Sequence, residues 1–189
     1  MVYVIIGLLI LVVALIVIVV SYYNNFINLR NRVTNAWAQI DVQLKRRADL
    51  IPNLVETVKG YAGHESRTLT NVVAARQAVV DAKTPEQSAE AENMLSGALR
   101  QIFALAEAYP DLKANQNFMQ LQGQLEETEN KISYMRQSYN DVVMMYNTAI
   151  SQFPGVIVAN LTNFKEAQSF ETAGADRETP AVDFSGLQA

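Results

Sequence analysis

The 189-residue chain contains no cysteine and only one histidine, His64. Without cysteine there is no disulfide framework, no thiol nucleophile and no thiolate metal site. A helical zinc site needs the pattern His-Glu-x-x-His. Here His64-Glu65 is followed by Thr68 at the position of the second histidine. A surface pair next to Gly63 is therefore the favoured interpretation, and we predict no metal and no cofactor.

Signals for enzyme chemistry are equally sparse. With one histidine, no Ser–His–Asp arrangement can be argued, and no glycine-rich phosphate loop is present. Glu126, Glu127 and Glu129 form the densest group of carboxylates. An acid–base pair needs carboxylates that face each other in a cleft, whereas neighbours on one helix mostly point to solvent. We therefore predict a solvated face at these residues and no catalytic site.

Positive charge is also limited. The net charge of −4, and the lack of a basic stripe with interleaved aromatic residues, argue against nucleic acid as a partner.

One long segment, from Val2 to Val20, has neither charge nor proline. As a helix it rises about 29 Å, which matches a hydrocarbon core of about 30 Å. A cleaved signal peptide would need basic residues before the run and a small-residue cleavage site after it. The chain has neither, and Tyr22 and Tyr23 follow where an aromatic belt is expected. Residues 1–23 are therefore predicted to be a single-pass membrane anchor.

The orientation of this anchor depends on few charges. Arg30 and Arg32 are the basic residues close enough to the membrane to count under the positive-inside rule. Because the N-terminal side offers almost none, the rule favours a domain in the cytoplasm, with a periplasmic domain as the alternative.

The residues after the anchor carry a helical period. Apolar residues from Val33 to Ala62 recur in steps of three and four, with a doubled step over Arg47 and Ala48. Nothing interrupts the pattern before Pro52, so we expect one continuous helix from the membrane. Pro52 cannot donate to the carbonyl of Ala48, so the helix either kinks there, which we favour, or restarts with Asp49 as its cap.

Two turns and a long heptad pattern follow. Thr84, Pro85 and Gln87 predict a capping box for a helix that runs to about Ala108. A second turn lies at Tyr109-Pro110-Asp111, with Asp111 as the expected cap. The last helix carries an apolar seam of heptad spacing, formed by Phe118, Leu121, Leu125, Thr128, Ile132, Met135, Tyr139, Val142, Tyr146 and Ala149.

Short connections favour use of this seam in an antiparallel bundle over a coiled coil with a separate chain. The predicted fold class is all-α, with an N-terminal transmembrane helix that continues into an antiparallel, up-and-down bundle of long helices over residues 24–164. Residues 165–189 show no period. We predict a mobile C-terminal tail there, with Val182 and Phe184 as docking points.

Several blocks of the sequence, in this order, closely resemble the LemA family: Arg30–Val33, Ala36–Arg47, Asp49–Val55, Tyr109–Asn115, Thr128–Ile132, Tyr139–Asn147 and Val182–Phe184. The resemblance implies a bacterial inner-membrane protein with a helical, bundle-like domain. It also implies an association with envelope stress, with a membrane metallopeptidase or, in one branch, with magnetosome formation. It brings no catalytic residues.

Two surfaces are candidates for an interface. The first is a row of amides just outside the membrane at helical spacing, Asn24, Asn28, Asn31 and Asn35. Amides both donate and accept hydrogen bonds. The row is therefore either a wet, exposed face or a contact between helices in a homo-oligomer, where such groups specify register.

The second surface is the basic triplet Lys45-Arg46-Arg47. On a straight helix it lies about 37 Å beyond Val20. Because the Debye length is only about 8 Å, the triplet cannot interact electrostatically with the headgroups of the same membrane. Pairing with Asp41 or Asp49 is favoured, and an acidic partner is the alternative.

These observations predict a membrane-anchored scaffold or adaptor that works through protein–protein contacts and self-association. The alternative is a monomeric accessory subunit of another membrane protein, such as a metallopeptidase.

Overall fold

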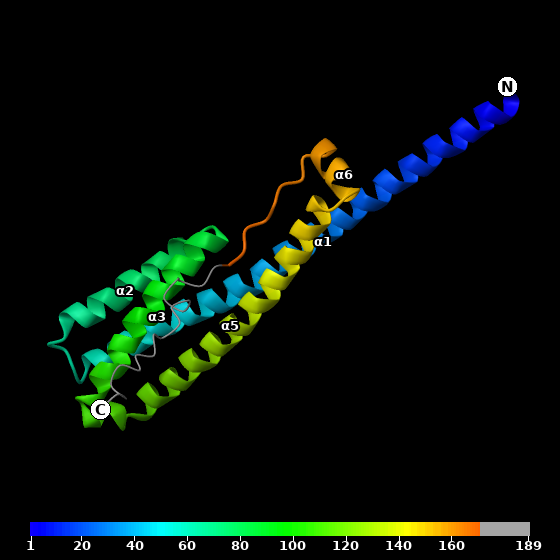
Figure 1. Cartoon of the computed structure of the whole chain (residues 1–189). Coiled ribbons are helices and arrows are strands. Elements are labelled where there is room, and N and C mark those ends of the chain that lie inside the picture. The colour runs from blue at the N-terminus through cyan, green and yellow to red at the C-terminus, as the bar shows by residue number, and fades with distance from the viewer. Residues whose placement is uncertain (171–189) are drawn as a thin grey trace, which may run out of the picture.

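The computed structural model describes residues 1–170, which form six helices and no strand. The helices are α1 (Val2–Lys59), α2 (Ser66–Asp81), α3 (Pro85–Glu107), α4 (Pro110–Lys113), α5 (Gln116–Ser151) and α6 (Gly155–Leu161). Figure 1 shows α2, α3 and α5 gathered along one half of α1, while the other half stands clear of them. The all-α prediction is confirmed.

The free half of α1 contains the predicted anchor. α1 is a single helix of 58 residues, and its N-terminal part is long and apolar enough to cross a membrane, with none of that window buried in the protein. The side chains of the apolar residues from Val2 to Val20 are exposed. A helix satisfies every backbone hydrogen bond internally, as a bilayer requires. The prediction of one helix that runs from the apolar segment into the bundle is therefore confirmed.

α5 packs antiparallel to the distal part of α1. Trp37 of α1 meets Tyr139 of α5 with ring centroids 5.9 Å apart. Tyr61, two residues beyond the end of α1, accepts a hydrogen bond from Asn115, just before α5 begins. The heptad seam of α5 provides the core of this pair, with these residues buried: Phe118, Leu125, Thr128, Ile132, Tyr139 and Tyr146. The seam is thus used within the chain.

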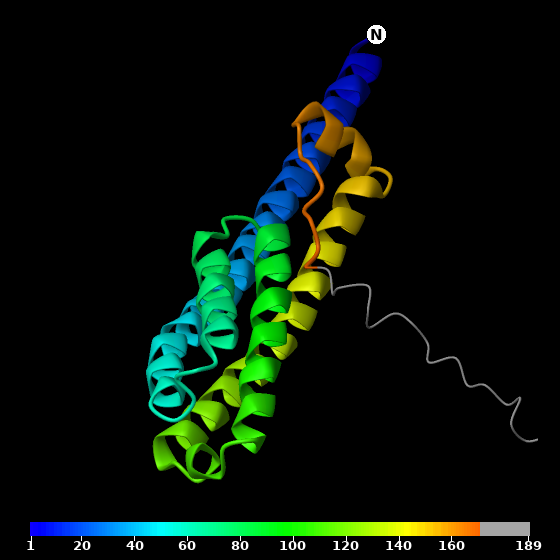
Figure 2. The same ribbon diagram turned by 90° about the vertical axis from the view of Figure 1, so that its left-hand side faces the viewer.

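α2 and α3 form a hairpin that covers another side of α1, as Figure 2 shows.

Thr84 begins α3 as predicted, because its Oγ1 accepts from the backbone N–H of Gln87 at 3.2 Å. The Gln87 side chain returns to the N–H of Lys83 at 3.0 Å, one residue earlier than in an ideal capping box. The capping prediction for the next turn is wrong. Asn115, not Asp111, caps α5, because its Oδ1 accepts from the N–H of Phe118 at 3.1 Å.

Pro52 lies inside α1 and does not end it. The alternative of a restart with Asp49 as cap is therefore wrong, and the favoured kink stays a prediction. Because proline has no N–H, the carbonyl of Ala48 loses its partner in the helix. The guanidinium of Arg76 on α2 replaces it, with Nε donating to the Ala48 oxygen at 3.0 Å. The lost helical bond thus becomes a bond between two helices.

This replacement makes a testable prediction. Arg76→Met should destabilise the bundle by about 1–3 kcal/mol, because a partly buried carbonyl loses its only donor. In a Pro52→Ala background the cost should be clearly smaller, since the alanine N–H can again bond the carbonyl of Ala48. The measurement is urea unfolding of the detergent-solubilised chain, followed by the fluorescence of Trp37, its single tryptophan.

The control is Arg67→Met, which removes an exposed arginine from the same helix. An equal cost of Arg76→Met in both backgrounds would contradict the assigned role of Arg76, because a double-mutant cycle isolates the coupling between the two positions.

Candidate functional site

The amide row of Asn24, Asn28, Asn31 and Asn35, called the amide stripe below, lies exposed along α1. The opposite side of the same segment is buried, with Phe26 at 0% and Leu29 at 8% exposure. The stripe therefore begins one turn beyond the apolar segment and faces away from α5 and α6. Its four amides have their hydrogen-bonding groups at the surface. Whether they bind a second chain stays a prediction.

The basic triplet divides into surface and interior. Lys45 forms an exposed ion pair with Asp41 at 2.6 Å, which is the helical pairing that the sequence favoured. Arg46 is exposed. Arg47 is 4% exposed and points into the bundle. The three residues therefore do not form one surface, and Arg47 is withdrawn from any contact with a partner.

Arg47 lies at the centre of a buried ionic cluster. Its Nη1 pairs with the carboxylates of Glu92 on α3 and Glu129 on α5, and donates to Ser96 Oγ at 3.2 Å. Glu92 is 1% exposed, whereas the side chain of Glu129 is 42% exposed. One guanidinium thus ties three helices together. Charges taken out of water need such partners, because an unpaired buried charge costs several kcal/mol.

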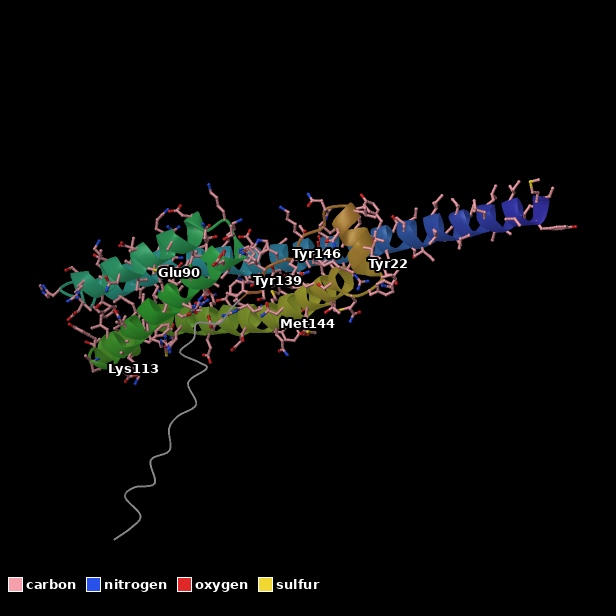
Figure 3. The ribbon with its side chains drawn as sticks, turned by 45° about the horizontal axis from the view of Figure 1, so that its top comes forward. Tyr22, Glu90, Lys113, Tyr139, Met144 and Tyr146 are labelled. Atoms are coloured by element: carbon pink, nitrogen blue, oxygen red, sulfur yellow. The ribbon has the colours of Figure 1, made fainter. Side chains whose placement is uncertain are left out.

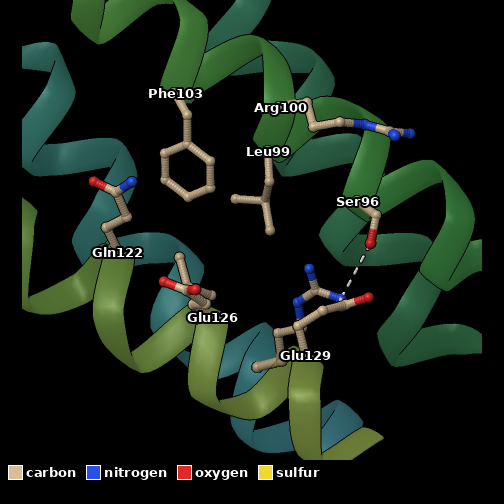
Figure 4. Close-up of a pocket in the computed structure, with 9 residues that line it drawn as sticks. Ser96, Leu99, Arg100, Phe103, Gln122, Glu126 and Glu129 are labelled. Atoms are coloured by element: carbon tan, nitrogen blue, oxygen red, sulfur yellow. Dashed lines mark hydrogen bonds and ion pairs between the residues drawn. The ribbon is translucent and has the colours of Figure 1, made fainter. Parts of the chain in front are cut away.

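Three members of the cluster, Arg47, Ser96 and Glu129, line a cleft of about 460 Å³ between α3 and α5. Figure 4 shows Leu99 and Phe103 on the α3 side and Gln122 and Glu126 on the α5 side. The cleft combines the ring of Phe103 and the side chains of two leucines with charges of both signs.

The three neighbouring glutamates of α5 have separate surroundings. Glu127 pairs with Lys131 at the surface, and that hydrogen bond, with the charge of Lys131, lowers the pKa of its carboxyl. Glu126 lines the cleft, and Glu129 joins the ionic cluster. The prediction of a uniform solvated face therefore holds for Glu127 and is wrong for Glu129.

His64 is exposed in the connection between α1 and α2. Within residues 1–170, no group of three or more histidine, cysteine or acidic side chains is arranged to hold a metal ion.

A further site was missed in the sequence. Residues 164–170, called the strap below, run extended along α5, and two Tyr-Asn pairs of α5 hold their backbone. Asn147 donates to the carbonyl of Ala167 at 2.9 Å and accepts from its N–H at 2.9 Å. Asn140 binds both backbone groups of Phe170 in the same way, at 3.1 and 2.8 Å.

The tyrosines of the two pairs complete the site. Tyr146 Oη donates to the carbonyl of Lys165, and Tyr139 Oη to that of Gln168, each at 2.8 Å. Figure 3 shows the two tyrosines in succession along α5. Burial raises the pKa of both hydroxyls above the ordinary value of 10.0. They therefore remain donors below pH 10, and these bonds are lost only as the pH rises above their raised pKa values.

The spacing of the pairs explains the fit. Seven residues of helix rise about 10.5 Å, and three residues of extended chain span about 10 Å. The pairs lie seven residues apart on α5, and the strap residues that they bind lie three apart. Phe170, 1% exposed, ends the strap beneath Trp37 and Arg136.

The predicted tail from residue 165 therefore differs from the structure over residues 165–170, which are bound to α5. Val182 and Phe184, the predicted docking points, lie outside the described residues.

The model of the LemA family matches residues 36–184. This chain belongs to the LemA family. It is similar to magnetosome protein MamQ 2 of Paramagnetospirillum magneticum, at 25% identity over 90% of this chain and 72% of the relative. It is also similar to protein LemA of Metamycoplasma hominis, at 26% identity over 87% of this chain and 75% of the relative. MamQ of Magnetospirillum gryphiswaldense is 24% identical over 85% and 68%.

The blocks that resemble the LemA family contain residues that join one element of this structure to another. The block Ala36–Arg47 supplies Trp37 and Arg47, and Asp49–Val55 contains Pro52. The block Tyr139–Asn147 supplies both Tyr-Asn pairs that hold the strap. What these LemA-family segments share is therefore the binding of one element to another.

The residues missed in the sequence had partial signals. Glu92 falls on the buried face of α3, as Arg47 falls on that of α1. A charged residue on an apolar face needs a partner, so a buried ion pair could have been predicted. Its pairing could not, since the two residues lie on different helices. Nothing in the sequence marked the strap.

The ionic cluster generates a stability prediction. Arg47→Met should destabilise the bundle by about 3–5 kcal/mol, because Glu92 is left as a buried charge without a partner. Arg47→Met combined with Glu92→Leu should recover much of this loss. The exposed neighbour provides the control, since Arg46→Met should change stability by less than about 0.5 kcal/mol. Urea unfolding monitored by Trp37 measures all three, and equal effects of the two single variants would refute the assignment.

The strap generates a second prediction. Asn140→Leu with Asn147→Leu should raise the rate of tryptic cleavage after Lys165 roughly ten-fold or more, because losing hydrogen bonds of about 0.5–1.5 kcal/mol each increases the released population. The emission of Trp37 should move to longer wavelength as Phe170 leaves it. Asn117→Leu and Asn130→Leu, both at exposed positions of α5, are the matched controls. Unchanged cleavage would show that the amides do not hold the strap.

Proposed function

We propose that this LemA-family chain is a membrane-anchored scaffold or adaptor that acts through protein–protein contacts and self-assembles through the amide stripe. The observation that carries this proposal is the continuity of α1. One helix contains both the apolar segment and the stripe. Because the helix is unbroken, it fixes the distance of the stripe from the bilayer and the direction in which the four amides point relative to the bundle.

The chemistry of the stripe favours contact between copies. Each amide is both donor and acceptor, so it can pair with an identical amide. Two copies anchored in the same membrane leave it in parallel, which brings Asn28 and Asn31 of one copy opposite the same residues of the other. Such a contact is self-complementary and closes as a two-fold dimer. Amides at a helix interface specify register at some cost in stability.

We propose that the anchor lies in the bacterial inner membrane and that the bundle is in the cytoplasm. Arg30 and Arg32 support this orientation, because basic residues within about 15–20 positions of a membrane span favour the cytoplasmic side. The proposed role is not enzymatic, and its setting is envelope stress or membrane organisation, the associations of the LemA family. The cleft between α3 and α5 favours a second candidate, a monomeric accessory subunit that binds a segment of another membrane protein.

The proposal predicts a change in assembly. Asn28→Asp with Asn31→Asp should convert a defined multimer of the full-length chain into smaller species, because like charges would face each other across the interface. The measurement is the absolute mass of the detergent-solubilised protein by light scattering. Asn71→Asp with Asn117→Asp adds the same charge at exposed positions of α2 and α5 and should leave the mass unchanged.

The outcomes separate the two candidates. A wild-type multimer that persists in the stripe variant would remove the stripe as the interface. A wild-type monomer over a wide concentration range would exclude self-assembly and favour the accessory subunit. A fragment that starts at Asn24 tests the anchor's part, since the scaffold requires it to assemble less than the full-length chain.

A further inference from the structure

The last helix exposes an apolar face that the bundle does not use. From Ser151 to Phe164 the chain carries no charged residue. On α6, Ile157 and Leu161 lie one turn apart and are 52% and 76% exposed, and Phe153, in the turn just before α6, is 81% exposed. Scattered apolar residues at a surface are ordinary, but apolar side chains gathered on and beside one short helix mark a contact site.

α6 lies against the part of α1 that leaves the apolar segment. Gly155 approaches α1 so closely that a Cβ at this position would lie 3.2 Å from Phe26 Cζ and 2.6 Å from the Ala149 carbonyl oxygen. Tyr22 is also in contact range of that position, at 3.5 Å. Figure 3 shows Tyr22 beside α6. Only glycine permits this approach. It places α6 beside Tyr22 and Phe26 along the axis of α1.

The end of α6 is closed on the bundle side. Asn163 adopts a positive φ of 57°, and the N–H of Phe164 bonds the carbonyl of Ala159 at 3.0 Å. This is a Schellman ending with asparagine in the left-handed position. Phe164 then packs on the ring of Phe26 at 5.4 Å, beneath the guanidinium of Arg30. Both ends of α6 are thus attached to α1.

The direction of the exposed face follows from the packing. α6 is turned by 89° from α5, which runs alongside α1, so α6 lies across the axis of α1 (Figure 1). Its buried face, with Val158 and Ala159, joins a cluster that includes Leu29 and Ile150. α5 approaches the anchor and ends just before α6, so this cluster lies on the bundle side. The opposite face, with Ile157 and Leu161, therefore points away from this cluster and out of the bundle.

The height of α6 matches the edge of a bilayer. Tyr22 and Phe26 lie two and six residues beyond Val20, which is about 3–9 Å along a helix. The polar layer on each side of a bilayer is about 5–8 Å thick. A helix that lies in this layer, parallel to the membrane plane, places its apolar face at the acyl boundary.

We propose that α6 is a membrane-interfacial helix, and that Phe153, Ile157 and Leu161 insert into the headgroup–acyl boundary of the bilayer that residues 2–20 cross. The inference rests on the anchor in the proposed function. With α6 in the interface, the chain touches the bilayer at two points. The anchor alone would leave the bundle free to rotate about and tilt with α1, and the second point prevents both.

The charges near α6 favour a bilayer that contains anionic lipids. Residues 1–40 and 142–165 contain no acidic residue, while Arg30, Arg32 and Lys165 lie within them. Cations at this height are attracted by anionic headgroups. The occupant to which the structure points is therefore the bilayer, and a second copy of the chain is the competing occupant.

The absence of cysteine allows a direct test with the full-length chain. Single-cysteine variants Ile157→Cys and Leu161→Cys are labelled with an environment-sensitive fluorophore and reconstituted in vesicles of phosphatidylethanolamine and phosphatidylglycerol. We expect quenching by a spin label near the top of the acyl chain and protection from aqueous iodide. Val73→Cys, a half-exposed apolar position on α2, is the matched control and should show the reverse. Trp37 fluorescence reports whether each variant is folded.

A probe at Leu11→Cys separates this inference from the proposed function. If the probe at position 11 is quenched by deep lipid labels while those at positions 157 and 161 behave as the probe at position 73 does, the interfacial helix is refuted and the anchor stands. If position 11 is also accessible to iodide, the anchor fails, and with it the proposed function. Protection of positions 157 and 161 from both iodide and lipid labels would identify a protein contact and overturn the assignment to lipid.

Discussion

The structure depends on one constraint: the backbone N–H and C=O groups of the apolar segment of α1 must form their hydrogen bonds within the helix. In a bilayer no water is available to an open N–H or C=O group, so the apolar segment has to be helical. The helix then continues to Lys59. α2, α3 and α5 pack on its distal part, and α6 packs on the segment around Phe26. The one bond that Pro52 removes is replaced by Arg76 from α2. The bundle is thus attached to the anchor through a continuous hydrogen-bonded rod.

Polar groups rather than apolar area define how the elements meet. Apolar seams allow neighbouring helices to slide by a turn with little penalty, whereas a buried guanidinium has one set of partners. Arg47 sets α1, α3 and α5 against each other through Glu92, Ser96 and Glu129. The Tyr-Asn pairs of α5 do the same for the strap, because the rise of seven helical residues equals the span of three extended ones.

The two ends of the bundle differ in character. The end near the anchor carries the amide stripe, the apolar face of α6 and the cations Arg30, Arg32 and Lys165. The far end carries the cleft between α3 and α5, which Arg47, Ser96 and Glu129 help to line. The proposed contacts with the membrane and with other copies use the first end, and the proposed contact with a partner's side chain uses the second. A scaffold of the kind proposed needs both, one surface that fixes its position and another that binds a partner.

The sequence by itself determined the apolar first segment, the long first helix, the cap at Thr84, the heptad seam of α5 and the resemblance to the LemA family. Each of these depends on spacing within one segment, where helical geometry relates neighbours directly. Only the tertiary structure decided that Arg47 pairs with Glu92 and Glu129, that Arg76 replaces the bond lost at Pro52, and that residues 165–170 bind α5. These contacts join residues 19 to 82 positions apart. Their geometry comes from the packing of helices against one another, and local periodicity contains no information about it.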